Sequence, residues 1–284
     1  MAFSVNTNVG AMAALQELNR TSKGLAVTQD RITSGKNVNS TRDDSATYIN
    51  AQNLRGKLGD LKAVNSSLGN AKSVVDIAVS GTEQISDLVN QMKTLTKQAA
   101  DTTISGEQRS ALNKDFQGLI KQVTTIVSTA EFNGKNLLAG TDNVAAIQSL
   151  ADADASAPGY QPDTLQVSNA LLNLPSTGSE LNTGSTLPDP STALTVDGYL
   201  DAYKVKVTNA LSDLGTASRR IDAQLSFTSK LSDTIESGIG NLVYADMAKE
   251  SAKLTALQTK QQLGVQALSI ANQAPQMIGQ LFKG

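Results

Sequence analysis

The chain of 284 residues contains no cysteine, no histidine and no tryptophan, and only 4% of its residues are aromatic. Without cysteine there is no disulfide framework and no thiol nucleophile. Without histidine, an HExxH zinc site, a Ser-His-Asp triad and a Cys-His pair are all impossible. The acidic residues are scattered, with no cluster beyond Asp43 and Asp44. We therefore expect no catalytic, metal-binding or cofactor-binding residues, and a chain that is not an enzyme.

The shortage of aromatic side chains also argues against a compact globular core, because aromatic residues bury the most area each. A net charge of −2 gives no electrostatic basis for binding nucleic acid or an anionic membrane. No apolar stretch approaches the roughly 18 residues that a transmembrane helix needs. The segment Met1–Asn8 has neither the basic nor the apolar run of a secretory signal.

Apolar residues instead recur every seven positions in two segments that are far apart in the sequence. An apolar seam with this period has to meet another helix. We therefore expect a mainly α fold, in which the N- and C-terminal regions form a long antiparallel coiled-coil-like helical bundle around a small β-hairpin or irregular middle region. The seam residues are Leu54, Leu61, Leu68, Val75, Ile85, Val89, Met92, Leu214, Ile221, Leu225 and Ile235.

Local signals place the N-terminal helices at residues 11–34, 45–101 and 107–129. Gly35 follows the last apolar residue of the first helix, where a left-handed cap is expected. Asn133-Gly134 lies between apolar flanks, a pattern typical of a tight β-hairpin.

The middle of the chain differs in composition, since five of the six prolines lie between residues 139 and 200. Residues 164–167 and 193–196 have the composition of short strands. A helix is expected to resume near residues 196–203 and to continue to about residue 271, where Pro275 stops it.

Three motifs, in order along the chain, resemble those of the bacterial flagellin family. The segment 29–44 is similar to the family's N-terminal signature, Phe132-Asn133-Gly134 to its hairpin after the helices, and 271–276 to its Ala-Asn-Gln-x-Pro-Gln motif. The signature residues are Arg31, Gly35, Asn39, Arg42, Asp43, Asp44, Asn272, Gln273, Pro275 and Gln276.

The resemblance implies a structural subunit that polymerises with itself into the flagellar filament, outside the cell, for swimming motility. It further implies export without a cleaved signal peptide, and hook–filament junction and cap proteins, a flagellin chaperone and the flagellar export apparatus as partners.

The resemblance also implies a layered subunit. Residues 1–44 and 241–284 would form an inner tube, 45–138 and 199–240 an outer core layer, and 139–198 a variable solvent-facing region. The apolar contacts expected in the inner tube are Leu15, Leu18, Leu25, Ile32, Leu254, Leu257, Leu268, Met277, Ile278, Leu281 and Phe282.

Two alternatives to a filament subunit stay open at this point. One is a hook–filament junction protein of the same family, and the other is an intracellular coiled-coil adaptor. The sequence Arg42-Asp43-Asp44 also has two interpretations. It is a simple helix start whose acids complement the helix dipole, or it forms ion pairs that lock the turn-rich connector at residues 34–40 between the inner and outer layers.

Overall fold

The computed structural model describes residues 8–152 and 162–281 of the chain. In these residues there are five helices and four short strands, so the mainly α fold expected from the sequence is confirmed. The chain divides into two compact units: unit 1 comprises Met1–Leu58 and Asp233–Gly284, and unit 2 comprises Gly59–Ser232. Two long helices, α2 (Ser45–Ala99) and α4 (Pro190–Val243), contribute residues to both units.

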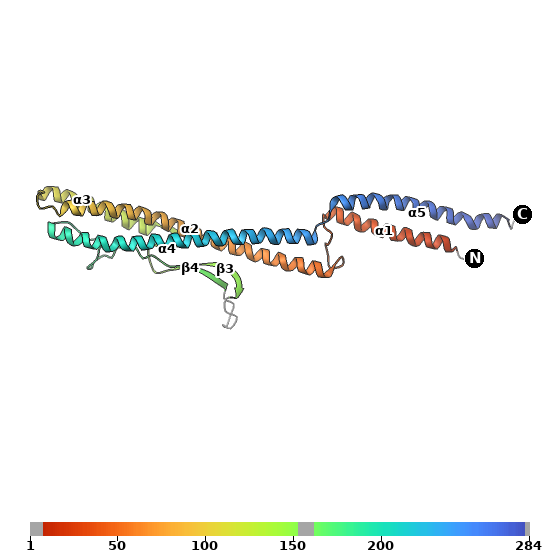
Figure 1. Cartoon of the computed structure of the whole chain (residues 1–284), viewed down its shortest axis with the longest axis horizontal. Coiled ribbons are helices and arrows are strands. Elements are labelled where there is room, and N and C mark those ends of the chain that lie inside the picture. Colours follow the sequence, from red (N-terminus) through yellow and green to blue (C-terminus); the bar gives the residue numbers. More distant parts are fainter. Residues whose placement is uncertain (1–7, 153–161, 282–284) are drawn as a thin grey trace. The chain divides into compact units, whose positions relative to one another are not determined.

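Unit 1 contains two helices that run antiparallel, α1 (Val9–Ser34) and α5 (Met247–Leu281) (Figure 1). α1 begins where Asn8 Oδ1 accepts a hydrogen bond from the backbone N–H of Ala11 at 3.0 Å. It ends at Gly35, whose φ of 68° confirms the left-handed cap. The first turns of α2 pack against the last turns of α4 in a small apolar cluster, made of Ala51, Leu54, Ile235, Ile239 and Val243.

In unit 2, α2, α3 (Gly106–Thr129) and α4 share one continuous apolar core, in which Phe116 of α3 is fully buried. α3 begins with a capping box: Ser105 Oγ accepts from the Gln108 N–H, and Gln108 Oε1 accepts from the Ser105 N–H. Arg109 Nε donates to the carbonyl of Ala99 at 2.9 Å and so satisfies an acceptor at the end of α2. The core thus joins three helices whose ends are individually capped.

Two antiparallel hairpins complete unit 2. β1 (Glu131–Phe132) and β2 (Lys135–Asn136) are joined by Asn133 and Gly134, which have φ values of 51° and 75°. Two consecutive positive φ values are the requirement of the tight hairpin turn that this dipeptide predicts. β3 (Val144–Asp152) pairs with β4 (Pro162–Val167), with Val144 opposite Val167. The strand expected at residues 164–167 is therefore confirmed.

The strand expected at residues 193–196 is wrong, because this segment lies in the first turns of α4. Asp189 Oδ1 accepts a hydrogen bond from the Thr192 N–H at 2.9 Å and caps the helix. Pro190 occupies the first helical position, where a missing N–H costs nothing. Ala193 and Val196 are buried at a helical spacing, so burial on one face decides against the strand preference of the β-branched residues.

The expectation of one uninterrupted helix from about residue 200 to 271 is also wrong. α4 ends at Val243 and α5 begins at Met247. Asp246 Oδ1 accepts from the backbone N–H groups of Ala248 and Lys249 at 3.0 and 3.1 Å, which makes Asp246 a helix cap. The break lies opposite the turn after α1 and is held there by backbone hydrogen bonds.

Pro275 does not stop the last helix, which continues to Leu281. Proline lacks the N–H that would bond the carbonyl of Ala271 four residues earlier. In unit 1 that carbonyl accepts a hydrogen bond from Asn8 Nδ2 at 2.7 Å instead. The acceptor that proline leaves open is therefore satisfied from another helix.

The middle segment has no separate core, but it contributes several leucines to the shared core of unit 2. Tyr203 of α4 donates from its hydroxyl to the carbonyl of Leu172 at 2.6 Å, and the Leu172 N–H donates to the carbonyl of Leu138 at 2.8 Å. The buried apolar residues of this segment are Ala146, Leu165, Val167, Leu172, Leu174, Leu181 and Leu187. The segment is anchored to the helices at many points along its length.

Candidate self-assembly surfaces

The seam between α1 and α5 is narrow. Along it, Leu18 lies by Gly264, and Gly24 lies by Leu257. A Cβ added at Gly264 would lie 3.4 Å from Leu18 Cδ1, and one added at Gly24 would lie 3.6 Å from both terminal methyl groups of Leu257. The expected inner-tube residues Leu18, Leu25, Ile32, Leu254, Leu257 and Leu268 are only partly buried in this seam. A single pair of helices therefore leaves much of their apolar surface uncovered.

Other apolar side chains of the pair point away from this seam. Ile270 is 69% exposed and Leu15, an expected inner-tube residue, is 49% exposed. We call these exposed residues of the first turns of α1 and the later turns of α5 the uncovered apolar face, although they flank the seam on both of its sides; they are Val9, Met12, Leu15, Leu263, Val265 and Ile270. Single exposed apolar residues are ordinary, but several large ones gathered on one pair of helices indicate an interaction surface.

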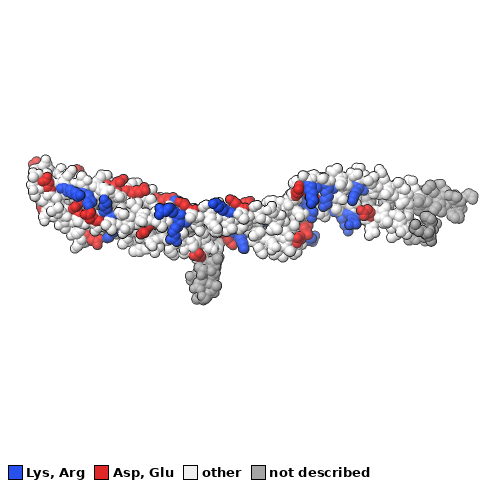
Figure 2. All heavy atoms as spheres, in the orientation of Figure 1, with Lys and Arg blue, Asp and Glu red and all other residues white. Residues whose placement is uncertain are grey.

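The uncovered apolar face coincides with a part of the chain that carries no charge. Residues 8–16 and 261–281 contain no Asp, Glu, Lys or Arg. On the face seen in Figure 2, the charged side chains of unit 1 gather away from the chain termini, and the white surface beyond them leads to the grey atoms. Removing an uncharged apolar surface from water carries no desolvation penalty for charged groups, which favours a protein–protein contact.

The signature around Gly35 forms a connector that is hydrogen-bonded to the break between α4 and α5. The backbone N–H of Asn37 donates to the carbonyl of Val243 at 2.7 Å, and the Ala245 N–H donates to the carbonyl of Gly35 at 3.0 Å. Lys36 and Tyr244 form an isolated antiparallel β-bridge. We call these contacts the connector clasp, and they join segments more than 200 residues apart in the sequence.

Two acidic residues of the signature shape the connector by accepting N–H groups. Asp43 Oδ2 accepts from the N–H groups of Asn39 and Ser40 at 3.0 and 2.9 Å, and Asp44 Oδ1 caps α2 by accepting from Ala46 and Thr47 at 3.0 and 3.2 Å. Hydrogen bonds from the Asn39 N–H lower the pKa of Asp43, and the Thr47 hydroxyl lowers the pKa of Asp44.

The alternative of ion pairs in the connector does not hold for these side chains. Within the described part of the chain, Arg42, Asp43 and Asp44 form no ion pair, and Arg42 is exposed. The signature arginine that does pair is Arg31, whose Nη1 lies 3.4 Å from Oε1 of the buried Glu250. This contact joins the end of α1 to the start of α5.

The C-terminal signature lies within α5. Asn272 and Gln273 are exposed in the single chain. Pro275 and Gln276 lie on the helical backbone, and the side chains from residue 274 onward, with the expected contacts of Met277, Ile278 and Leu281, lie outside the described side chains. Phe282 lies outside the described residues altogether. The structure thus places this motif on the same helix as the uncovered apolar face.

The seam residues expected from the heptad repeat come together. The fully or nearly fully buried members are Leu68, Val75, Ile85, Val89, Met92, Leu214 and Ile221. Leu61 is half-buried, and Leu225 packs against the core of unit 2. Leu54 and Ile235 pack in the small cluster of unit 1.

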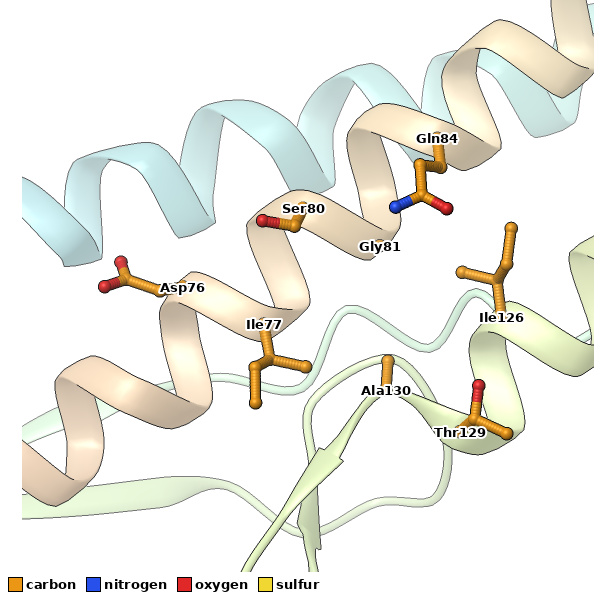
Figure 3. A pocket seen from close by; sticks show the side chains of 8 residues that line it. All are labelled: Asp76, Ile77, Ser80, Gly81, Gln84, Ile126, Thr129 and Ala130. Carbon is orange, nitrogen blue, oxygen red and sulfur yellow. The ribbon is translucent and has the colours of Figure 1, made fainter.

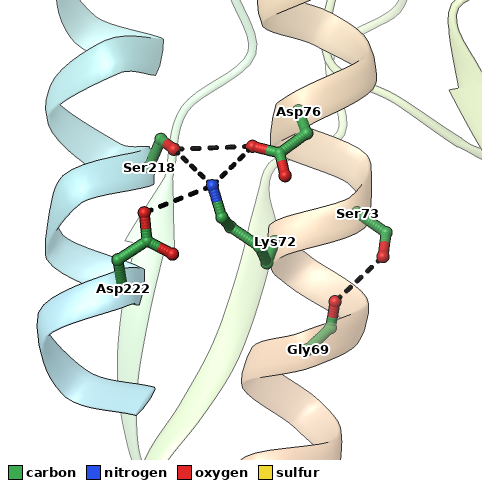
Figure 4. A network of polar contacts seen from close by, with 6 residues as sticks. All are labelled: Gly69, Lys72, Ser73, Asp76, Ser218 and Asp222. Carbon is green, nitrogen blue, oxygen red and sulfur yellow. Dashed lines mark hydrogen bonds and ion pairs between the residues drawn. The ribbon is translucent and has the colours of Figure 1, made fainter. Parts of the chain in front are cut away.

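Charged side chains bridge α2 and α4 beside this seam. Lys72 Nζ lies 2.7 Å from Asp76 Oδ1, 2.8 Å from Ser218 Oγ and 3.3 Å from Asp222 Oδ2 (Figure 4). The hydrogen bond to Asp76 raises the pKa of Lys72, so the amine stays charged. Lys93 and Asp201 form a second bridge, and the hydrogen bond to Asp201 raises the pKa of Lys93. These bridges join the two helices beside their apolar seam.

A groove lies between α2 and the end of α3, with a volume of about 360 Å³ (Figure 3). Ile77, Ile126 and Ala130 point into it, and Asp76 is the one titratable group on its rim. The described residues hold no cluster of acids that could bind a metal ion. None of the described helices combines the length and the hydropathy needed to cross a membrane.

Sequence reasoning missed several residues of unit 1. Thr21 and Thr28 are the buried residues of α1, and they lie seven positions apart on its seam. Their spacing continues the heptad pattern, but a search for apolar residues passes over threonine. Asn8 was also missed, because its second partner is 263 residues away along the chain.

The long paired helices, the buried seam and the uncovered apolar face define a structural protein that is completed by other chains. Comparisons with known proteins agree. Residues 5–143 match the bacterial flagellin N-terminal helical region, and residues 198–282 match the bacterial flagellin C-terminal helical region. The chain belongs to the bacterial flagellin family.

Individual relatives cover nearly all of the chain. It is 41% identical to flagellin FljM of Caulobacter vibrioides over 99% of this chain and 98% of that protein. It is 32% identical to a flagellin of Brucella melitensis over 99% of both. The fold resembles that of a putative flagellar hook-associated protein from Vibrio parahaemolyticus, with a TM-score of 0.53 and 14% identity over 71% of this chain and 100% of the other.

The chain is therefore a short flagellin, a structural subunit of the flagellar filament outside the cell, and not an enzyme. Flagellins assemble with copies of themselves, which agrees with a surface that a single chain leaves uncovered.

Proposed function

We propose that the α1–α5 pair forms the inner layer of the filament, with the helices of unit 2 as an outer layer and the part of residues 139–198 that precedes α4 outermost. The observation that carries this proposal is the uncovered apolar face on an uncharged part of the chain. A layer of side-by-side copies buries such a face in a contact that repeats without closing. Each apolar side chain that becomes fully buried contributes about 1.5–3 kcal/mol to assembly.

In this arrangement the signature residues have separate roles. Gly35, Asp43 and Asp44 shape the connector, since the first provides its turn and the other two accept its N–H groups. Arg31 fixes the start of α5 through Glu250. Asn272, Gln273 and Gln276, on the same helix as the uncovered apolar face, are assigned to contacts with neighbouring copies.

A charge placed on the uncovered apolar face tests the layer assignment. Ile270→Asp should leave the unfolding of unit 2 unchanged, because Ile270 belongs to unit 1 and is largely exposed in the single chain. It should prevent filament growth, because the carboxylate would be buried without a partner between copies. The matched control is Gln166→Asp on the exposed face of β4, which should assemble normally. Normal growth of the Ile270→Asp chain, measured by sedimentation and electron microscopy, contradicts the assignment.

The further partners in this proposal are the hook–filament junction and cap proteins, a flagellin chaperone and the flagellar export apparatus. Membership of the flagellin family supports these partners. It also supports export without a cleaved signal peptide. Mass spectrometry of subunits from assembled filaments tests the last point. A mass that shows the loss of further N-terminal residues besides Met1 contradicts it.

A further inference from the structure

The side-chain amide of Asn8 forms hydrogen bonds with two different helices, one through its oxygen and one through its nitrogen. Its Oδ1 accepts from the Ala11 N–H at 3.0 Å and caps α1. Its Nδ2 donates to the carbonyl of Ala271 on α5 at 2.7 Å. Asparagine is one of the few residues that can cap a helix and still offer a second, independent donor.

The carbonyl of Ala271 is open to this donor because of the residue four positions later. In an uninterrupted helix it would accept from the N–H of residue 275, but Pro275 has none. α5 nevertheless continues past the proline to Leu281. The proline therefore creates an acceptor inside a helix, at the level of the start of α1.

The register of the seam between α1 and α5 depends on which residues of the two helices are paired along it. Small residues and leucines recur along both helices, with Gly24 near Leu257 and Gly264 near Leu18. A slip of α5 by seven residues would bring Gly264 to Gly24 or Leu257 to Leu18, so the matched glycine and leucine positions already disfavour it. Polar contacts of defined geometry can specify the same register more strictly.

We propose that Asn8 and Pro275 together form a register clip, in which Asn8 is a positioning residue that sets where α1 pairs with α5. The Arg31–Glu250 ion pair marks the other end of the same seam, at 3.4 Å. With one polar contact at each end, a slipped pairing leaves the Ala271 carbonyl without a donor and the buried Glu250 without its arginine. A test of the clip by filament growth rests on the proposed function, because it requires that the chain assembles into filaments.

The test is a cycle of two substitutions in the full chain. Asn8→Ser keeps a capping oxygen but has no second donor that reaches Ala271. In the native background it should raise the critical concentration for filament growth about five-fold, the typical effect of one lost hydrogen bond. Pro275→Ala restores the helical N–H, so in that background Asn8→Ser should change the critical concentration less than about two-fold. An equal effect in both backgrounds overturns the clip.

A direct readout separates the clip from the assembly proposal. Isotope labelling allows a through-space nuclear magnetic resonance correlation between Asn8 Nδ2 and the carbonyl carbon of Ala271 to be measured on pelleted filaments where the chain polymerises, and on the free chain where it does not. The correlation should be present in the native chain and absent in Asn8→Ser. A chain that does not polymerise but shows the correlation contradicts the proposed layers and supports the clip. Filaments that lack the correlation overturn the clip alone.

Discussion

Two glycines of α2 differ in what surrounds them. A Cβ added at Gly81 would lie 3.0 Å from Leu138 Cδ1 and 3.5 Å from both Ala130 Cβ and Ile126 Cγ2, whereas one at Gly69 would meet nothing within 4 Å. Alanine is favoured over glycine in a helix by about 1 kcal/mol. The close approach of Ile126, Ala130 and Leu138 to α2 therefore depends on Gly81 but not on Gly69.

From this difference we predict opposite effects of the same substitution. Gly69→Ala should raise the free energy of unfolding by about 0.5–1 kcal/mol. Gly81→Ala should lower it, because Leu138 is fully buried and has little room to move. Chemical denaturation of the free chain measures both values. Equal stabilisation by the two changes would mean that Leu138 does not pack closely on Gly81 as described.

Tyr203 joins the middle segment to α4 by the hydrogen bond to Leu172. Tyr203→Phe removes the donor and leaves a carbonyl buried, which should cost about 1–2 kcal/mol of stability. Burial raises the pKa of Tyr203 above its ordinary value of 10.0. Because the unfolded chain loses this proton first, the stabilisation is complete below pH 10 and is lost as the pH rises above it.

Denaturant unfolding at a series of pH values between about 9 and 11 checks this prediction. The native chain should lose stability as the pH rises through this range, and Tyr203→Phe should show a shallower decline. The other four tyrosines remain in the variant and serve as an internal control. Parallel declines in the two proteins would rule out a special contribution of Tyr203.

At the residue scale, sequence reasoning succeeded where the cause is local. Gly35 ends a helix and Asn133-Gly134 turns a hairpin because of their own backbone preferences. The partners of Asp43 and Asp44 are likewise at most four residues away. Asn8 and Tyr203 could not be predicted, since their partners are set by the packing of distant segments.

At the scale of elements, the connector combines a turn, two acidic acceptors and the connector clasp. The lowered pKa values of Asp43 and Asp44 mean that these carboxylates stabilise the connector above their ordinary pKa of 3.8. That stabilisation is lost as the pH falls below 3.8 and through the lowered values. We therefore predict that filaments dissociate more readily in this acidic range.

The double variant Asp43→Asn, Asp44→Asn tests this origin of acid sensitivity. Asparagine still caps helices but does not titrate. Light scattering of filaments across the acidic range should show a weaker pH dependence for the variant than for the native chain. The same dependence in both would assign acid dissociation to other carboxylates.

The middle segment gives a further prediction about an element. Replacing residues 170–187 by a Gly-Ser linker of equal length should lower the thermal stability of unit 2. Four leucines that lie in the core, each worth about 1.5–3 kcal/mol, would be lost. The matched control replaces only residues 176–179, which are exposed. Circular dichroism should show a lower midpoint for the first variant and an unchanged one for the second.

Elements were predictable from the sequence wherever the heptad repeat is long. The bounds of α2 and α3 follow from their periodic apolar residues and their caps. The start of α4 was misjudged because Thr and Val favour strands when only neighbours are considered. The break at residues 244–246 contains no glycine or proline, and its position depends on backbone hydrogen bonds to the connector.

At the scale of the whole molecule, the surface left uncovered predicts a difference between free and assembled chains. The backbone amides at residues 8–40 and 240–273 should exchange rapidly in the free chain, because α1 and α5 bury little apolar surface as a pair. Assembly should protect them. Hydrogen exchange followed by mass spectrometry on free and sedimented chains measures this. Strong protection of both segments in a verified monomer would show that the pair is stable alone.

The sequence separation of the contacts in unit 1 has a consequence for the order of events during synthesis. Asn8 leaves the ribosome first among the described residues, and its partner Ala271 follows 263 residues later. Closing so long a loop is slow, and even the contact of Arg31 with Glu250 joins α1 to α5 across 219 residues. The leading end of the chain therefore waits, unpaired, until the trailing end has been made. The same long-range pairing that completes the subunit therefore also postpones its completion.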